Sequence, residues 1–342
     1  MRIESAGNGE EEDDGINRWR GHSGDDLVVR IVYFGTPQLA VPTLNAVAEH
    51  HEVVAVVTQP DRPRGRSGKP APPAVKTWAL EHGLQVHQPE KLHDGVFEAW
   101  LREQNPELCV VAAYGRLLKQ PVLDVPPKGW LNLHPSLLPR WRGPSPIQTA
   151  ILEGDTKTGV TIMRIVLEMD AGDIVLQKET PITPEETAGE LTVRLADMGA
   201  ALMIEAIALV ERDAAPAIPQ NPARVTISKV FEKSHGRIQW AEPAQRIHNR
   251  VRACNPWPMA QCMFRNRFCR ILRTLPIHTP TDATPGAVIA VEKDCIIVAT
   301  GHGRIAVTEL QMAGRKALDA SAFLRGAPVT PGERFEDISD AG

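Results

Sequence analysis

The sequence has few cysteines, and none of them form close pairs. Only five occur among the 342 residues, and none shows the C-x-x-C spacing that is typical of structural zinc sites. They are Cys109, Cys254, Cys262, Cys269 and Cys295. We therefore expect reduced thiols, as in a cytosolic protein, and no metal bound through cysteine.

Long apolar runs are missing as well. No stretch approaches the roughly 20 apolar residues that a membrane-spanning helix needs. The N-terminus lacks the basic and then apolar pattern of a secretion signal. These absences predict a cytoplasmic protein that has no membrane partner.

Glycine-rich phosphate loops are the third absence. The first apolar run, residues 27–34, ends in Gly35-Thr36-Pro37 and not in a G-x-G-x-x-G or G-x-x-x-x-G-K motif. A dinucleotide or nucleoside triphosphate needs several glycines there, because the backbone must approach the phosphates closely. This argues against a dehydrogenase or an ATPase, although both commonly use α/β folds.

The composition is that of a soluble globular protein, with 42% hydrophobic and 23% charged residues. Its length allows two domains of ordinary size. The net charge of -4 does not indicate a nucleic-acid binder, but a global sum can hide local basic patches. Residues 1–26 are polar and acidic, which predicts a disordered tail unless the natural start lies further downstream.

Short apolar segments alternate with helical ones in residues 27–213. The strands are predicted at 27–34, 52–58, 84–87, 107–113 and 130–133, and helices at 38–49, 74–82, 94–103 and 187–212. This alternation is typical of an α/β domain with a doubly wound parallel sheet, of Rossmann-like form.

The texture changes after residue 213. Residues 214–227 are rich in proline and predict a linker. Within residues 228–335, short β-type segments at 287–290, 295–299 and 304–310 are separated by turns. They predict a small C-terminal domain that resembles a β-barrel.

Asn132 and His134 are the first candidate pair for chemistry. In an extended strand, residues two apart project to the same face, and in α/β sheets ligands bind beyond the carboxyl ends of the strands. An amide and an imidazole side by side there would stabilise an oxyanion formed at a carbonyl carbon. The alternative is a histidine satisfied in the core and an asparagine that forms a turn.

Asp170 lies in the segment Met169-Asp-Ala-Gly-Asp173, which follows the strand-like residues 159–166. An aspartate before glycine is often only a turn former. Beside His134, however, its carboxylate would orient the imidazole and favour the protonated form. Sequence spacing alone leaves both possibilities open.

These motifs together resemble the folate-dependent formyltransferases, over about residues 28 to 335. The pattern Asn132-x-His-Pro-Ser-Leu-Leu-Pro139 followed by Met-Asp-x-Gly-Asp173 carries the resemblance. Supporting segments in the same order are Phe34–Pro37, Thr58–Pro63, Val111–Gly115, Gly159–Met163 and Asn255–Met259. So many ordered matches are more specific than any single motif.

The resemblance implies an enzyme of translation initiation. It implies that 10-formyltetrahydrofolate, as co-substrate, donates a formyl group to the free amino group of methionyl initiator tRNA, without a metal. Asn132 and a protonated His134 would stabilise the oxyanion, and Asp170 would orient His134. The folate site would be formed by Ser136, Leu137, Leu138, Pro139, Tyr114 and Gly115. We expect a monomer.

Basic residues suggest where tRNA would bind. By resemblance, Arg62, Arg64, Arg66 and Lys69 lie in a loop that enters the acceptor stem, and the C-terminal domain is an oligonucleotide-binding (OB-like) barrel that contacts tRNA. Ten basic residues gather between 228 and 274 (Lys229, Lys233, Arg237, Arg246, Arg250, Arg252, Arg265, Arg267, Arg270 and Arg273). The alternative for the loop is an ordinary solvated surface.

Trp257 is predicted to pack in the core.

Two other functions remain open from sequence alone. One is a formyltransferase that acts on a nucleotide sugar or a purine precursor, which would share the trio but not the basic loop combined with this C-terminal domain. The other is an RNA-binding protein that kept the fold and lost catalysis. The intact trio argues against the second.

Overall fold

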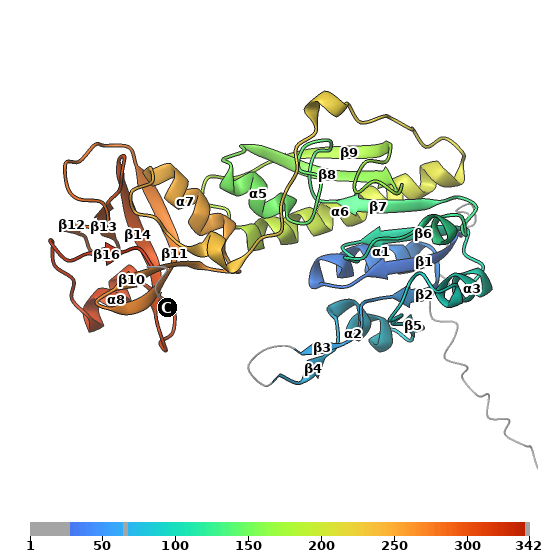
Figure 1. The fold of residues 1–342 in the computed structure, drawn as a ribbon, viewed down its shortest axis with the longest axis horizontal. Helices are drawn as coiled ribbons and strands as arrows, with labels where there is room; N and C mark the ends of the chain where they lie inside the picture. Colours follow the sequence, from blue (N-terminus) through green and yellow to red (C-terminus); the bar gives the residue numbers. More distant parts are fainter. Residues whose placement is uncertain (1–27, 64–67, 339–342) are drawn as a thin grey trace, which may run out of the picture.

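The computed structural model describes residues 28–63 and 68–338. Its N-terminal part is built on a 7-stranded sheet in the order β5-β2-β1-β6-β7-β8-β9 (Figure 1). The strands are β1 (Arg30–Gly35), β2 (Glu52–Val57), β5 (Val86–His87), β6 (Leu108–Ala112), β7 (Trp130–His134), β8 (Lys157–Arg164) and β9 (Ile174–Pro181). The helices are η1 (Gln38–Ala40), α1 (Val41–His50), α2 (Ala74–Glu81), α3 (Val96–Glu103), α4 (Gln120–Leu123), α5 (Pro146–Leu152) and α6 (Ala188–Glu211).

The sheet is buried on both faces because its strands are apolar at successive positions. Ile31 and Tyr33 of β1 join the core on the side of α1 and α6, whereas Val32 and Phe34 join the core on the side of α3. Strand side chains alternate between faces, so a continuous apolar run supplies two cores at once. The predicted doubly wound α/β domain is confirmed.

One strand, β8, departs from the expected parallel arrangement. β5, β2, β1, β6 and β7 are parallel, but β8 pairs antiparallel with both β7 and β9. The short connection between β8 and β9, residues 165–173, has no crossover helix, and parallel neighbours require such a crossover. The same connection carries Asp170.

The C-terminal part is an antiparallel sheet in the order β12-β13-β14-β11-β10-β16, with β15 beside β14. Its elements are η3 (Lys233–Gly236), α7 (Ala244–Ala253), β10 (Ala260–Phe264), β11 (Arg267–Ile277), β12 (Val288–Val291), β13 (Ile296–Ala299), β14 (Arg304–Met312), β15 (Leu318–Asp319), α8 (Ala320–Gly326) and β16 (Phe335–Glu336). The sheet curls until a bridge joins Ala287 to Arg334. The predicted β-barrel-like fold class is confirmed in this half-barrel.

The two parts share one continuous apolar core. Leu191 of α6 belongs to the same buried cluster as Ile247 and Val251 of α7. Between them, residues 212–232 pass along the N-terminal part and include only the short helix η2 (Pro222–Arg224). Within the described residues, no helix is long and apolar enough to cross a membrane.

Candidate active site

Asn132 and His134 lie on the central strand β7, where Asn132 is flanked by Val111 of β6 and Met163 of β8. The intervening Leu133 points to the opposite face and packs under α6. Leu133 and α6 are in close contact, because a Cβ on Gly199 of that helix would lie 2.3 Å from Cδ1 of Leu133. Packing on one face therefore holds the polar pair on the other.

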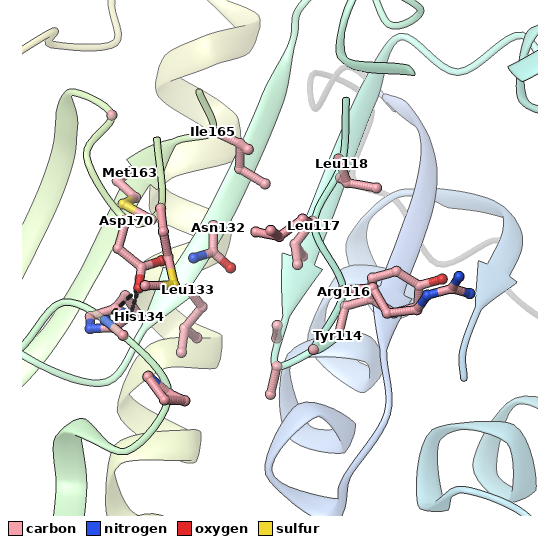
Figure 2. Close-up of a pocket in the computed structure, with 18 of the residues that line it drawn as sticks. Tyr114, Arg116, Leu117, Leu118, Asn132, Leu133, His134, Met163, Ile165 and Asp170 are labelled. Atoms are coloured by element: carbon pink, nitrogen blue, oxygen red, sulfur yellow. Dashed lines mark hydrogen bonds and ion pairs between the residues drawn. The ribbon is translucent and has the colours of Figure 1, made fainter. Parts of the chain in front are cut away.

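The polar face opens into a cavity of about 570 Å³. Asn132, His134 and Asp170 all line it, together with residues 111–118, which include the end of β6 and the loop after it, and most of the β8–β9 connection. In Figure 2 the trio lies on one side of the cavity, and Tyr114, Leu117 and Leu118 lie on the other. The volume is typical of a small-molecule site.

His134 is held from two sides and is only 4% exposed. Its Nε2 lies 2.9 Å from the carbonyl oxygen of Trp141, and its Nδ1 lies 3.7 Å from Oδ2 of Asp170. A carbonyl oxygen can only accept a hydrogen bond, so Nε2 carries a proton and Nδ1 faces the carboxylate. The structure thus brings the predicted histidine and aspartate together.

The pKa of His134 is shifted in the direction opposite to the one that the sequence predicted. Burial lowers the pKa of His134 below its usual 6.5, and the attraction of Asp170 and the Trp141 carbonyl offset this only in part. A protonated His134 at neutral pH is therefore not supported for the free site, because desolvation outweighs the single carboxylate.

Asp170 occupies a strained position. Its φ of 52° lies in the left-handed region, which residues with a Cβ adopt at an energetic cost. Oδ2 accepts a hydrogen bond of 2.7 Å from the backbone N–H of Gly143. Strained backbone that the surroundings hold in place is common at functional sites, and here it aims the carboxylate at His134.

The side-chain amide of Asn132 has no hydrogen-bond partner among residues 28–63 and 68–338. It lies half-buried in the cavity wall, within reach of a bound molecule. A half-buried amide without a partner in the protein is available to donate to a ligand oxygen. This suits the predicted role in stabilising an oxyanion.

The residues predicted to bind folate separate into two groups. Tyr114 and Gly115 line the cavity. Ser136, Leu137, Leu138 and Pro139 are all described by the structure, and none of the four lines it. Leu138 packs instead against Met163 and Ile174, and the Ser136 hydroxyl donates to the Arg140 carbonyl. The tight turn after β7 directs this segment away from the cavity.

Sequence reasoning missed the apolar rim of the cavity. Leu117, Val166, Leu167 and Met169 line it, yet they are among the most exposed large apolar side chains of the described residues. Exposed apolar groups around a concave site are typical of surfaces that a ligand covers. A local signal existed in the run Ile165-Val166-Leu167, which extends past the end of β8.

The predicted tRNA-binding loop lies only in part within the described residues. Arg62 and Lys69 flank it beside the two-stranded β3 (Arg62–Pro63) and β4 (Pro70–Ala71). Arg64 and Arg66 lie outside the described residues. Both described residues are exposed.

The ten basic residues of the C-terminal part do not form one free surface. Four of the arginines make ion pairs within the protein, namely Arg246 with Glu153, Arg250 with Glu242, Arg265 with Glu333 and Arg273 with Glu190. Arg252 is buried. The cationic surface open to a partner is therefore smaller than the sequence suggested.

Trp257 was predicted in the core, and this is wrong, since it is 52% exposed. The segment around it is anchored through its neighbours instead. Gly189 of α6 donates to the carbonyl of Asn255, and Pro256 packs directly on Gly189. With the neighbours turned inward, the indole is left at the surface.

Comparison with known proteins identifies both parts of the chain. A family model described as "Formyl transferase" matches residues 29–207, and one described as "Formyl transferase, C-terminal domain" matches residues 231–328. The methionyl-tRNA formyltransferase of Moorella thermoacetica is 44% identical over 306 residues, which are 89% of this chain and 98% of that protein. That of Solibacter usitatus is 43% identical over 308 residues, 90% of this chain and 98% of that protein.

Solved structures share the fold at lower identity. HypX from Aquifex aeolicus in complex with tetrahydrofolic acid has a TM-score of 0.61 at 19% identity, covering 92% of this chain and 51% of that one. WlaRD, a sugar 3N-formyl transferase, has a TM-score of 0.61 at 17% identity, covering 85% of this chain and all of that one. Because family models match both parts and close relatives extend along nearly the whole chain, this chain belongs to the formyl transferase family.

Proposed function

We propose that this chain transfers the formyl group of 10-formyltetrahydrofolate to the free amino group of methionyl initiator tRNA, using Asn132, His134 and Asp170. The observation that carries the proposal is that these three side chains meet at one wall of the cavity. The name shared by the similar relatives, methionyl-tRNA formyltransferase, supports the choice of acceptor.

Attack of the amine on the formyl carbon moves negative charge onto the formyl oxygen. The free amide of Asn132 is the group placed to donate a hydrogen bond to that oxyanion. Donors fixed in a water-poor cavity stabilise such charge more than water does, because they need no reorganisation during the reaction.

The same attack makes the amine nitrogen positive, and it must lose a proton. Neutral His134 presents its Nδ1 toward Asp170 and can accept this proton, while Asp170 stabilises the resulting imidazolium across 3.7 Å. The proton then passes to N10 of the folate carrier as the bond between that nitrogen and the formyl carbon breaks. Formation of one C–N bond is thus balanced by loss of the other.

We place the folate carrier in the cavity, against Tyr114, Gly115 and the apolar rim, because flat rings bury well on apolar walls. Ser136, Leu137, Leu138 and Pro139 would then support the site from behind. For tRNA we propose contacts from the loop that holds Arg62, Arg64, Arg66 and Lys69, and from the C-terminal domain.

The proposed organisation is a catalytic domain at 27–213, a linker at 214–227 and a tRNA-binding domain at 228–335, preceded by an acidic tail at 1–26. We further propose that the chain acts as a monomer in the cytoplasm, where its tRNA substrate is used. Light scattering of the purified protein, alone and with tRNA, tests the monomer.

An acceptor competition assay tests the function. The purified chain, with 10-formyltetrahydrofolate, is offered methionyl initiator tRNA together with an amino-sugar nucleotide, and both products are quantified. We expect formylation of the tRNA only, and a loss of about 10²–10³ in kcat for Asn132→Ala. Formylation of the sugar instead would replace the proposed acceptor, and a fully active Asn132→Ala would remove the proposed role of that residue.

A further inference from the structure

The segment 218–228 does more than join the two domains, because it is hydrogen-bonded to the loops that carry the catalytic side chains. Ile218 pairs through its backbone with Ile174, directly after the β8–β9 connection. Further on, Thr226 and Ser228 make backbone hydrogen bonds of 2.9 Å and 2.7 Å to Arg142. Between these two attachments lies Gln220.

The Gln220 side chain connects both loops. Its Nε2 donates to the carbonyl oxygens of Asp170 and Gly172, each at 2.8 Å, and its Oε1 accepts from Nε of Arg142 at 3.0 Å. Carbonyls only accept and a guanidinium only donates, so this is the one orientation of the amide that satisfies every partner. The amide is therefore fixed in place.

The residues on either side of Arg142 contact the catalytic pair. The Trp141 carbonyl holds Nε2 of His134, and the Gly143 N–H holds Oδ2 of Asp170. Arg142 is buried, and its guanidinium also pairs with Glu168 at 2.9 Å. A shift of Arg142 relative to the Asp170 turn would thus change the separation of His134 and Asp170.

The Asp170 turn needs such support. Its left-handed φ of 52° is unfavourable for a residue with a side chain, and strained turns persist only where the surroundings hold them. Two hydrogen bonds from one amide hold the carbonyls of Asp170 and Gly172, and Gln220 itself does not line the cavity.

We propose that Gln220 is a positioning residue of the active site, which locks the Asp170 turn to Arg142 and so sets the geometry of the His134–Asp170 pair. Because Gln220 lies between the two domains, the segment that tethers the C-terminal domain also completes the catalytic site. The expected effect on kcat rests on the proposed function, but the expected effect on the geometry of the His134–Asp170 pair does not.

The test uses the full chain and two substitutions of different chemistry. Gln220→Met keeps the length and removes all three hydrogen bonds, whereas Gln220→Glu keeps an acceptor for Arg142 and loses both donors. Asn221→Ala is the matched control, because the side chain of that exposed neighbour makes a single hydrogen bond within the described part of the chain, from the N–H of Ala223. We expect both Gln220 variants to lose at least tenfold in kcat with KM values within twofold, and Asn221→Ala to match the wild type.

Two further measurements separate positioning from loss of fold. In an Asp170→Asn background, Gln220→Met should lower kcat by less than a further twofold, because the carboxylate that Gln220 positions is already absent. An NMR titration of the His134 ring, which needs no acceptor, should show its midpoint in Gln220→Met moved toward that of Asp170→Asn.

The results for Gln220→Met distinguish a failure of the positioning role from a failure of the proposed function. Unchanged kcat and an unchanged His134 midpoint in Gln220→Met would overturn the proposal, as would an equal loss in the Asp170→Asn background. A shifted midpoint in a chain that does not formylate methionyl-tRNA would keep the positioning role and refute the proposed function instead.

Discussion

His134 shows at the scale of one residue how packing and charge compete. Its imidazole is enclosed by protein, which disfavours the cation, while Asp170 and the Trp141 carbonyl favour it. Burial has the larger effect, so the ring is neutral near pH 7 in the free site. The alternation along a strand predicts that this ring lies beside Asn132. It does not predict how deeply the ring is buried, because burial depends on the packing of the whole domain.

We predict that an NMR titration of the His134 ring gives a pKa below 6.5. Asp170→Asn should lower it further, because the attraction that favours the imidazolium is removed. His134→Gln assigns the resonance among the 11 histidines. A pKa above 7 would instead support the permanently charged histidine that the sequence suggested.

The lowered pKa of His134 also determines how the stability of the fold changes with pH. Because the folded-state pKa lies below that of the unfolded chain, the unfolded chain binds more protons between the two values. The contribution of neutral His134 to the free energy of unfolding is therefore complete above pH 6.5 and is lost as the pH falls through this window. Burial also lowers the pKa values of His87 and His248, so these histidines act in the same direction.

At the scale of elements, the loop after β7 depends on a glycine. Gly143 has a φ of 108°, and a Cβ there would lie 2.5 Å from the carbonyl oxygen of Ser228. Its N–H also holds Asp170. No other residue allows the loop, the 218–228 segment and the Asp170 carboxylate to approach one another so closely.

We predict that Gly143→Ala lowers the free energy of unfolding by about 3 kcal/mol and reduces kcat, because both the backbone conformation and the contact with Ser228 are lost. Gly314→Ala is the control, since Gly314 has a φ of 74° with open space around it. It should cost only about 1 kcal/mol and leave kcat unchanged. Urea denaturation measures the stability of both variants, and steady-state kinetics measures their kcat. An equal loss of stability in the two variants would contradict the role of the contact between Gly143 and Ser228.

The elements that the sequence predicted best are those with strong periodicity. The apolar runs that became β1, β2 and β6, and the helical run that became α6, are recognisable because burial on two faces or on one stripe repeats along the chain. α7 was not predicted, because buried His248, Asn249 and Arg252 lie among its buried apolar residues Ile247 and Val251 and obscure the apolar stripe. The antiparallel pairing of β8 was also missed, because periodicity does not encode strand direction.

At the scale of the whole molecule, the two domains are joined through polar contacts as well as through the shared core. Arg252 of α7 donates to the carbonyls of Thr183 and Glu186, just before α6, and to Oδ1 of Asn249. Arg273 pairs with Glu190 across the same boundary. Such contacts fix the C-terminal domain relative to the cavity.

We predict that Arg252→Met lowers the free energy of unfolding by about 2 kcal/mol, because it removes the partly buried hydrogen bonds to the carbonyls of Thr183 and Glu186, whereas Oδ1 of Asn249 keeps a second donor in Gln245. Arg267→Met is the control, since that exposed side chain donates to a single carbonyl, that of Ala313. It should change stability by less than about 0.5 kcal/mol. Two variants of similar stability in urea would show that the interface tolerates the loss.

We also predict that tRNA affinity falls with salt, with a slope in log–log form of about −3 or steeper, as expected for several phosphate contacts. Arg62→Ala should reduce the slope by about one unit, and Arg246→Ala should not, because Arg246 already pairs with Glu153. Titrations from low to high salt measure this. A slope near zero would remove the electrostatic contribution to tRNA binding.

The sequence by itself determined the α/β class and the shared face of Asn132 and His134, because alternation along a strand is a local property. It also carried the ordered motifs of the formyl transferase family. Only the tertiary structure decided that Asp170 meets His134, that burial lowers the pKa of that ring, that Trp257 is exposed, and that Gln220 of the expected linker is hydrogen-bonded to the Asp170 turn. These features depend on distances and burial between segments far apart in the chain, which no local pattern specifies.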